Sequence, residues 1–391
     1  MESSEFSHSH FDSQYKPEQH LLFGGKSDMV DIRPETPHPD KPFPVLFVPG
    51  ITGNPDAYKG SLRMLSHKGR HVLSFSHPRT SDSITDTFDS YKSLVRTRLE
   101  QQEVASSDVD TYLDDIQKRG DYLIENYPKA GESFRHALNI LGFLEMKDID
   151  QADVVGHSGG GIDAVFAKYL APTKVGNLVL VETGGLIGKD SGLAVTGRNI
   201  KQVLLERDGV FPVNHDIDAL GDNDADIKAR VESVLADPQR AVDVAQLEVD
   251  KLSPGDAMRN VAHYVKGNPL QFVAETRALG FSQIDPLLEH IRKEGAKVGL
   301  IHAVDDPTFP MDGMQQSGAV RIDKDGKPGT VDGFVSVLGH HNTHAAEPRT
   351  MGWADELLTQ LDKKTKAEEN SEVNRGNAQS SLKDPNKESH S

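Results

Sequence analysis

The sequence predicts an α/β protein in which a mostly parallel sheet is covered by helices on both faces. Two observations lead to this fold class. Short apolar runs of strand length alternate with longer segments of helical pattern along much of the chain. The first run, residues 44–48, is apolar throughout, as in a strand that is buried on both sides, and it ends abruptly at Pro49-Gly50. Parallel strands that are joined by helices form such a sheet.

The strand-like runs are short, and the segments between them have helical signals. We expect strands at residues 44–48, 71–75, 152–155, 175–181, 297–301 and 333–338. After the first strand, Asn54 and Pro55 are typical of a helix start, and Gly69 is typical of a helix end. Residues 84–145 are rich in helical pattern, and a final amphipathic helix is expected from about Glu347.

The pattern also divides the chain into successive parts. Residues 1–42 predict an N-terminal arm that is partly disordered, although a short hairpin fits residues 21–32. Residues 43–185 and 291–362 predict the two halves of the sheet domain, whereas the acidic, mostly helical block 186–290 predicts a cap or lid inserted between them. Residues 363–391 have almost no apolar side chains and predict a disordered tail.

Composition excludes several classes of protein. The 391-residue chain has a formal charge of −17, which disfavours binding to nucleic acid and to anionic membrane surfaces. It contains no cysteine, which excludes thiolate metal sites, iron–sulfur clusters and a thiol nucleophile. Neither a secretory signal nor a membrane-spanning run is visible, so we expect a cytoplasmic protein without stable membrane insertion.

The most informative motif is Gly156-His157-Ser158-Gly159-Gly160, a G-x-S-x-G sequence between an expected strand and an expected helix. A strand that reverses sharply into a helix exposes the serine hydroxyl, and its neighbours must be small because two chain segments crowd together there. The N-terminus of the helix also stabilises negative charge at this point. The same glycines fit neither a phosphate-binding P-loop nor a dinucleotide fingerprint. The motif therefore predicts that Ser158 is a nucleophile.

A serine nucleophile needs a base and a carboxylate that orients the base. Asp305 and Asp306 follow the fifth expected strand, so either could place a carboxylate at the edge where the parallel strands end. His340 and His341 follow the sixth expected strand, and a base there could reach the serine. A rival hypothesis assigns one of these histidines and His344 to a metal site, but only one carboxylate and no cysteine lie nearby.

Two main-chain N–H groups are expected to stabilise the oxyanion that forms when a serine attacks a carbonyl. Gly159 supplies one because it follows the nucleophile. Ile51 is the candidate for the other, since it lies in the loop after the first strand, where Gly50 lets the backbone approach. We interpret His157, beside the nucleophile, as a packing and hydrogen-bonding residue and not as a second base.

These residues resemble the α/β-hydrolase superfamily, and specifically its serine esterases and lipases with a cap domain, over residues 43–185 and 295–362. The family's acid turn matches Ala303 to Pro310, which makes Asp306 the implied acid and leaves Asp305 in reserve. The family's base follows a glycine shortly before the last helix. Gly339-His340 fits this position, so His340 is the implied base, with His341 in reserve.

The resemblance also implies a reaction. It implies hydrolysis of a carboxylic ester through an acyl-enzyme, with a small-molecule ester as substrate and with neither a metal nor an organic cofactor. The alternatives are an acyltransferase that uses the same acyl-enzyme and a non-catalytic binding protein on this fold. A dehalogenase is disfavoured because Ser158 stands where that enzyme needs a carboxylate.

Apolar side chains in the expected cap favour an acyl group of small to medium size, although they could equally pack the cap onto the sheet domain. They are Tyr264, Val265, Leu270, Phe272, Val273, Leu279 and Phe281.

Overall fold

The structure is a computed structural model of the whole chain. It describes residues 10–51, 53–78, 80, 82–187, 192–201, 243–244, 254–255, 258, 262, 269–320, 329–337, 341 and 348–381.

The described strands form one nine-stranded sheet in the order β1-β2-β4-β3-β5-β6-β8-β9-β7. Only the β1–β2 and β2–β4 pairs are antiparallel, and all the other neighbours are parallel. The expected mostly parallel sheet is therefore confirmed. The strands are β1 Glu18–Leu22, β2 Gly25–Ile32, β3 Val45–Val48, β4 Val72–Phe75, β5 Ala152–His157, β6 Val175–Val181, β7 Asp243–Val244, β8 Val298–Ala303 and β9 Gly333–Val337.

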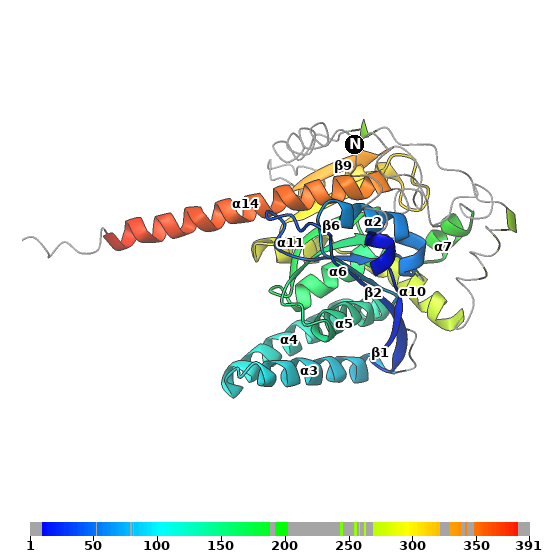
Figure 1. Ribbon diagram of the computed structural model, residues 1–391. Coiled ribbons are helices and arrows are strands. Elements are labelled where there is room, and N and C mark those ends of the chain that lie inside the picture. The colour runs from blue at the N-terminus through cyan, green and yellow to red at the C-terminus, as the bar shows by residue number, and fades with distance from the viewer. Residues whose placement is uncertain are drawn as a thin grey trace, which may run out of the picture.

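Helices cover both faces of this sheet. In Figure 1, α3, α4 and α5 lie on one side of the sheet, and α2 and α14 lie on the other. The elements are η1 Pro55–Tyr58, α2 Lys59–His67, α3 Ile84–Gln101, α4 Ser106–Asn126, α5 Gly131–Met146, α6 Gly159–Leu170, α7 Gly192–Lys201, α10 Pro269–Phe281, α11 Asp285–Lys293, α12 Met311–Gln316 and α14 Pro348–Ser381.

The central strands are apolar on both faces because successive side chains point to opposite sides of a strand. In β3, Leu46 and Val48 pack into the core beneath α5 and α6, whereas Val45 and Phe47 pack into the core beneath α2 and α14. All of these side chains have an exposed fraction of 0%. Burying each side chain of this size contributes about 1.5–3 kcal/mol to the free energy of unfolding. Because one strand buries side chains on both of its faces, it stabilises the packing of both helix layers.

The N-terminal arm contains the short hairpin that fits the sequence, and the hairpin begins at Glu18 instead of residue 21. β1 and β2 form a hairpin through Phe23 and Gly24, both of which have positive φ values, of 46° and 78°. β2 then pairs with β4, so the hairpin widens the sheet, and Met29 is 1% exposed. The sequence indicated a hairpin at residues 21–32, but its pairing with β4 is a long-range contact that no local pattern reports. We propose that the sheet domain begins at β1 instead of residue 43.

The C-terminal segment also differs from the expectation of disorder. Helix α14 continues to Ser381 and, in Figure 1, extends well beyond the sheet domain. Its distal part mixes good helix formers, such as lysine, glutamate and alanine, with poor ones, such as asparagine, serine and Gly376, so helix propensity alone does not explain this extension. Residues 382–391 lie outside the described part of the chain. Within the described ranges, no helix combines the length and the apolar character that crossing a bilayer requires.

The expected cap, residues 186–290, is described only in part. Among its described residues, α7 and α10 pack against each other, whereas β7 pairs with β9 at the edge of the sheet. Helix α11 packs against α6 and leads directly into β8. We therefore propose that the second half of the sheet domain begins at α11 and not at residue 291.

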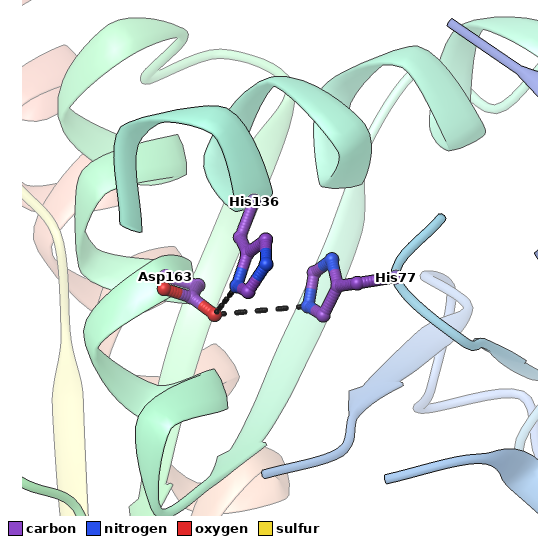
Figure 2. Close-up of side chains that lie close together, drawn as sticks. All are labelled: His77, His136 and Asp163. Carbon is purple, nitrogen blue, oxygen red and sulfur yellow. Dashed lines mark hydrogen bonds and ion pairs between the residues drawn. The ribbon is translucent and has the colours of Figure 1, made fainter. Parts of the chain in front are cut away.

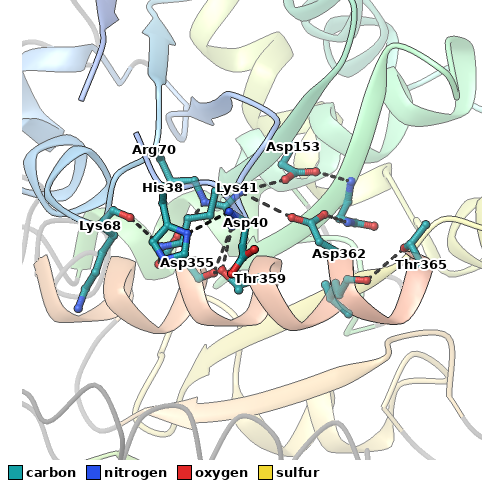
Figure 3. Close-up of polar contacts among 12 residues, drawn as sticks. His38, Asp40, Lys41, Lys68, Arg70, Asp153, Asp355, Thr359, Asp362 and Thr365 are labelled. Carbon is teal, nitrogen blue, oxygen red and sulfur yellow. Dashed lines mark hydrogen bonds and ion pairs between the residues drawn. The ribbon is translucent and has the colours of Figure 1, made fainter. Parts of the chain in front are cut away.

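A buried network of charges joins α14 to the start of β4 (Figure 3). Arg70, which has an exposed fraction of 0%, donates through Nε to Asp355 Oδ1 over 2.8 Å, and its Nη2 donates to Thr359 Oγ1 over 3.1 Å. Its Nη1 lies 3.4 Å from Asp153 Oδ2 and 3.8 Å from Asp362 Oδ2. Burial, with Asp362 adding to the effect, raises the pKa of Asp153 to about 7. One arginine thus compensates several buried carboxylates.

We expect Arg70→Leu to lower the free energy of unfolding by about 3–5 kcal/mol, because buried Asp153 loses the guanidinium beside it, whereas Asp355 keeps its ion pair with Lys41 at 2.7 Å. The raised pKa of Asp153 means that the folded state binds its proton more tightly than the unfolded state does. The contribution of Asp153 to the free energy of unfolding therefore falls as the pH rises from about 4 to 7. The decrease in the free energy of unfolding caused by Arg70→Leu should accordingly be larger at pH 8 than at pH 5.

Urea unfolding of both forms at the two pH values measures this effect. Arg96→Leu is the control, because Arg96 is 44% exposed and pairs with an exposed Asp110, a contact worth about 0–1 kcal/mol. Equal losses for the two variants would contradict the role of Arg70.

Candidate active site

Ser158 occupies the turn between β5 and α6 in a strained backbone conformation. Its φ is 53° and its ψ is −120°, a region that side-chain-bearing residues rarely adopt and that costs of order 1–3 kcal/mol. The turn is held from both sides, because the Ser158 N–H donates to Val181 O over 2.9 Å and the Thr183 hydroxyl donates to Ser158 O over 3.1 Å. The side chain of Ser158 is thereby directed away from both β5 and α6.

The glycines of the motif are required by close contacts between chain segments. A Cβ at Gly156 would lie 2.6 Å from Gly160 O, and a Cβ at Gly160 would lie 2.5 Å from Val48 O. Helix α6 therefore packs directly on the ends of β5 and β3. The carboxyl end of β3, where the candidate oxyanion loop begins, is fixed beside the serine by the same packing.

His341, the reserve candidate for the base, lies against Ser158. Its Nε2 is 2.9 Å from Ser158 Oγ, and its Nδ1 is 2.8 Å from Asp306 Oδ2. The side chain is almost fully buried, and the ring of Phe309 contacts it edge-on at 5.1 Å between centroids. His340, the residue that the family resemblance favoured, lies outside the described residues, as does His344. In the described structure the hydrogen bond to Ser158 is thus made by His341.

The carboxylate of Asp306 is held in place by its own loop. Its Oδ1 accepts hydrogen bonds from the N–H groups of Thr308, over 2.7 Å, and Phe309, over 3.0 Å, which leaves Oδ2 for His341. Burial raises the pKa of Asp306, but His341 outweighs this effect and keeps the pKa below its usual value. Asp305, the reserve acid, is exposed. The geometry thus brings Asp306 and not Asp305 to the imidazole.

The two candidate oxyanion donors lie side by side. A Cβ on Gly159 would be 3.0 Å from Ile51 Cγ1, so the loop after β3 contacts the first residue of α6. The first N–H groups of a helix have no partner within the helix, which leaves them available to an anion. The same position on Gly159 is 3.4 Å from Leu279 Cδ2 of α10. A helix from the expected cap therefore borders the oxyanion region.

His157 connects this loop to the backbone of the base. Burial lowers the pKa of His157 to about 3, with a further contribution from His341, so its ring is neutral. Its Nε2–H donates to His341 O over 3.3 Å, and its Nδ1 accepts from the Tyr58 hydroxyl over 3.1 Å. Tyr58 in turn accepts from the Gly50 N–H over 3.3 Å. These contacts agree with the interpretation of His157 as a hydrogen-bonding residue.

Sequence reasoning missed Glu182, a fully buried carboxylate beside these histidines. Its Oε2 is 3.7 Å from His157 Nε2 and 3.9 Å from His341 Nδ1. The available signal was its position directly after β6, at the same edge of the sheet that carries Asp306. His157, Glu182 and His341 could together approach a metal ion. However, both ring nitrogens of His341 already make the hydrogen bonds to Ser158 and Asp306.

The apolar residues expected to line an acyl pocket are divided by the structure. Leu279 is partly buried near the turn that contains Ser158, whereas Val273 is 60% exposed and Phe281 is 41% exposed. Lys129 Nζ lies 4.4 Å from the centre of the Phe281 ring, as on a protein surface. Tyr264, Val265, and the side chains of Leu270 and Phe272, lie outside the described part. Leu279 is thus the member of this set that the described structure places near Ser158.

We expect Ser158→Gly to be more stable than Ser158→Ala by about 1 kcal/mol, because glycine relieves the strain at φ 53° at the cost of a more flexible unfolded chain. Both variants lose the hydroxyl and its contact with His341, so each is the other's control. Chemical denaturation midpoints measure the difference. A glycine variant that is less stable than the alanine variant would contradict strain at this turn.

Comparison with known proteins adds the following. No family model matches the chain, and no curated protein matches it. Among solved structures, a meta-cleavage product hydrolase from Pseudomonas fluorescens is 13% identical, with 89% of this chain and 97% of that chain covered and a TM-score of 0.46. A structure from a study of carboxylesterases of Nitrososphaera gargenis is 16% identical, with coverages of 90% and 100% and a TM-score of 0.45. An epoxide hydrolase from Vigna radiata is 14% identical, with coverages of 91% and 99% and a TM-score of 0.44.

The fold of this chain follows from its own topology. The strand order has β3 between β4 and β5, the strained serine turn follows β5, and the loops after β8 and β9 carry Asp306 and His341. With this order of strands and this placement of the loops, the chain has the α/β-hydrolase fold.

Proposed function

We propose that this chain is a serine hydrolase that cleaves carboxylic esters through an acyl-enzyme on Ser158. The observation that carries the proposal is the continuous hydrogen-bonded series from Ser158 Oγ through His341 to Asp306, with distances of 2.9 Å and 2.8 Å. Such a series activates a hydroxyl that is otherwise a weak nucleophile. The strained turn supports the proposal, because strain of this kind is concentrated at functional sites.

In the first half of the reaction, Ser158 Oγ attacks the carbonyl carbon while its proton passes to His341 Nε2. The carbonyl oxygen becomes negative and is held by the N–H groups of Gly159 and Ile51. His341 then donates the proton to the leaving alcohol oxygen as the ester bond breaks. In the second half, His341 takes a proton from the water that attacks the acyl carbon, and it passes this proton to Ser158 Oγ as the bond between Ser158 and the acyl group breaks.

Asp306 acts through the imidazole. With Asp306 accepting at Nδ1, the proton of the neutral ring is on Nδ1 and the lone pair on Nε2 faces Ser158. The carboxylate also stabilises the imidazolium that forms during attack. The lowered pKa of Asp306 keeps it ionised at neutral pH, as this role requires. In this proposal His341 replaces His340 as the base.

A fluorophosphonate probe should label the wild-type protein, because the probe reacts with activated serines. Ser158→Ala should not be labelled, and His341→Ala should lose about 10⁴-fold or more in the rate of ester cleavage. His340→Ala is the matched control and should keep its rate within about tenfold, because His341 already makes the hydrogen bonds to Ser158 and Asp306. Gel fluorescence and p-nitrophenyl acetate kinetics measure both effects. Loss of activity in His340→Ala with activity retained in His341→Ala would reverse the assignment.

We further propose an acyl group of small to medium size, because the Leu279 side chain borders Gly159, the candidate oxyanion donor, where a long acyl chain would meet it. Across p-nitrophenyl esters from C2 to C16, the wild-type kcat/KM should pass through a maximum at a short or medium chain. Leu279→Ala should move this maximum to longer chains. The kcat/KM should change by about 10–200-fold for each methylene group that the wild-type site excludes and the variant accepts. Val273→Ala, at a 60% exposed position, should leave the profile unchanged. A wild-type rate that rises steadily to C16 would contradict the proposal.

A further inference from the structure

A second group of ionisable side chains meets in the interior, away from the hydroxyl of Ser158. Figure 2 shows His77, from the loop after β4, beside His136 of α5 and Asp163 of α6. Glu275 of α10 approaches His136 from its other side. The exposed fractions are 3% for His136, 4% for Asp163 and 6% for Glu275, and the His77 side chain is 9% exposed. The proposed reaction uses none of these groups.

The donor atoms converge on one point. Asp163 Oδ2 is 3.0 Å from His136 Nδ1 and 3.6 Å from His77 Nε2. These ligand atoms all lie within 4.8 Å of one another. Bonds of about 2.0–2.1 Å in tetrahedral geometry place the ligands of a zinc ion about 3.3 Å apart, so the two distances bracket the spacing that a shared ion would need.

Hydrogen bonding leaves much of the group unsatisfied. Among the described residues, neither nitrogen of His77 has a hydrogen-bond partner, and the same holds for His136 Nε2 and Glu275 Oε2. The rings of His77 and His136 stack at 3.9 Å between centroids, and His77 Nε2 lies 3.6 Å from Asp163 Oδ2 without a hydrogen bond. A buried polar atom without a hydrogen-bond partner lowers the stability of the folded state. A bound ion would remove this free-energy cost.

Glu275 completes the arrangement as an outer partner. Its Oε1 lies 3.7 Å from His136 Nε2, the nitrogen that faces away from Asp163. Metal-binding histidines commonly direct their second N–H at a carboxylate, which fixes the ring and raises its basicity. His136 thus presents Nδ1 inward and Nε2 to a carboxylate, as a metal ligand does.

We propose that His77, His136 and Asp163 bind a divalent transition metal, with Zn²⁺ the best fit to two imidazoles and one carboxylate. The ion would tie the loop after β4 to α5 and α6. Helix α6 begins directly after Ser158. The ion would therefore stabilise the helix that follows the serine turn. This site is separate from the proposed hydrolysis, and either inference can fail without the other.

The test uses the full chain after metal removal with a chelator and dialysis. Co²⁺ is titrated in as a spectroscopic substitute for Zn²⁺, because its visible absorption reports ligand number and geometry. The wild type should take up one equivalent with intense bands typical of a four-coordinate site. Zn²⁺ at about 100-fold above its Kd should raise the Tm by about 5 °C.

Matched variants identify the ligands. His77→Gln and His136→Gln should each lose the Co²⁺ bands and the shift in Tm, whereas His20→Gln, at a 37% exposed histidine in β1, should keep both. If a ligand variant fails to fold, Glu275→Gln supplies the test, because loss of an outer partner should weaken metal affinity by about 10–100-fold with the ligands intact.

The opposite result is equally specific. Wild-type protein that takes up no more Co²⁺ than the His77→Gln variant, and whose Tm does not respond to Zn²⁺, would overturn the site. So would Co²⁺ bands that persist unchanged in both histidine variants. Fluorophosphonate labelling of the same samples reports separately on Ser158, so a failed metal site is distinguishable from a failed hydrolase.

Discussion

The chain reversal at Ser158 is the constraint on which the rest of the structure depends. β5 has to end and α6 begin within one residue, and this is possible only because Gly156 and Gly160 allow backbone to lie against backbone. The packing fixes the end of β3, and with it Ile51, next to the start of α6. The sheet then needs only to bring the loops after β8 and β9 to the same edge for an acid and a base to reach the hydroxyl.

Much of this could be predicted from the sequence, because the information was local. The central strands are short runs rich in apolar residues, and the serine turn can be recognised by glycines at fixed spacing. The choice of Asp306 over Asp305 was implied only by resemblance to a family, and it depends on loop amides that hold one carboxylate and leave the other exposed. The hairpin of β1 and β2 was missed as part of the sheet, because pairing with β4 is a long-range contact.

The base illustrates a limit of sequence reasoning. His340 and His341 are adjacent, and the distance from a preceding glycine cannot decide which ring turns inward. In the structure, the backbone carbonyl of His341 accepts from His157 while its ring bridges Ser158 and Asp306. The contacts of buried polar groups could not be predicted either, because the partners of Arg70 and Asp163 come from distant parts of the chain. Composition shows that such residues are present but not which of them meet.

The central claim is that one serine hydroxyl, one imidazole and two main-chain N–H groups converge on a single reacting carbon. A crystal structure of the protein after reaction with a fluorophosphonate tests this most directly. We predict phosphorus bonded to Ser158 Oγ, His341 Nε2 within hydrogen-bonding distance of the adduct, and a phosphoryl oxygen about 2.7–3.1 Å from the amide nitrogens of Gly159 and Ile51. Phosphorus on another residue, or an oxygen that points away from both amides, would contradict the account.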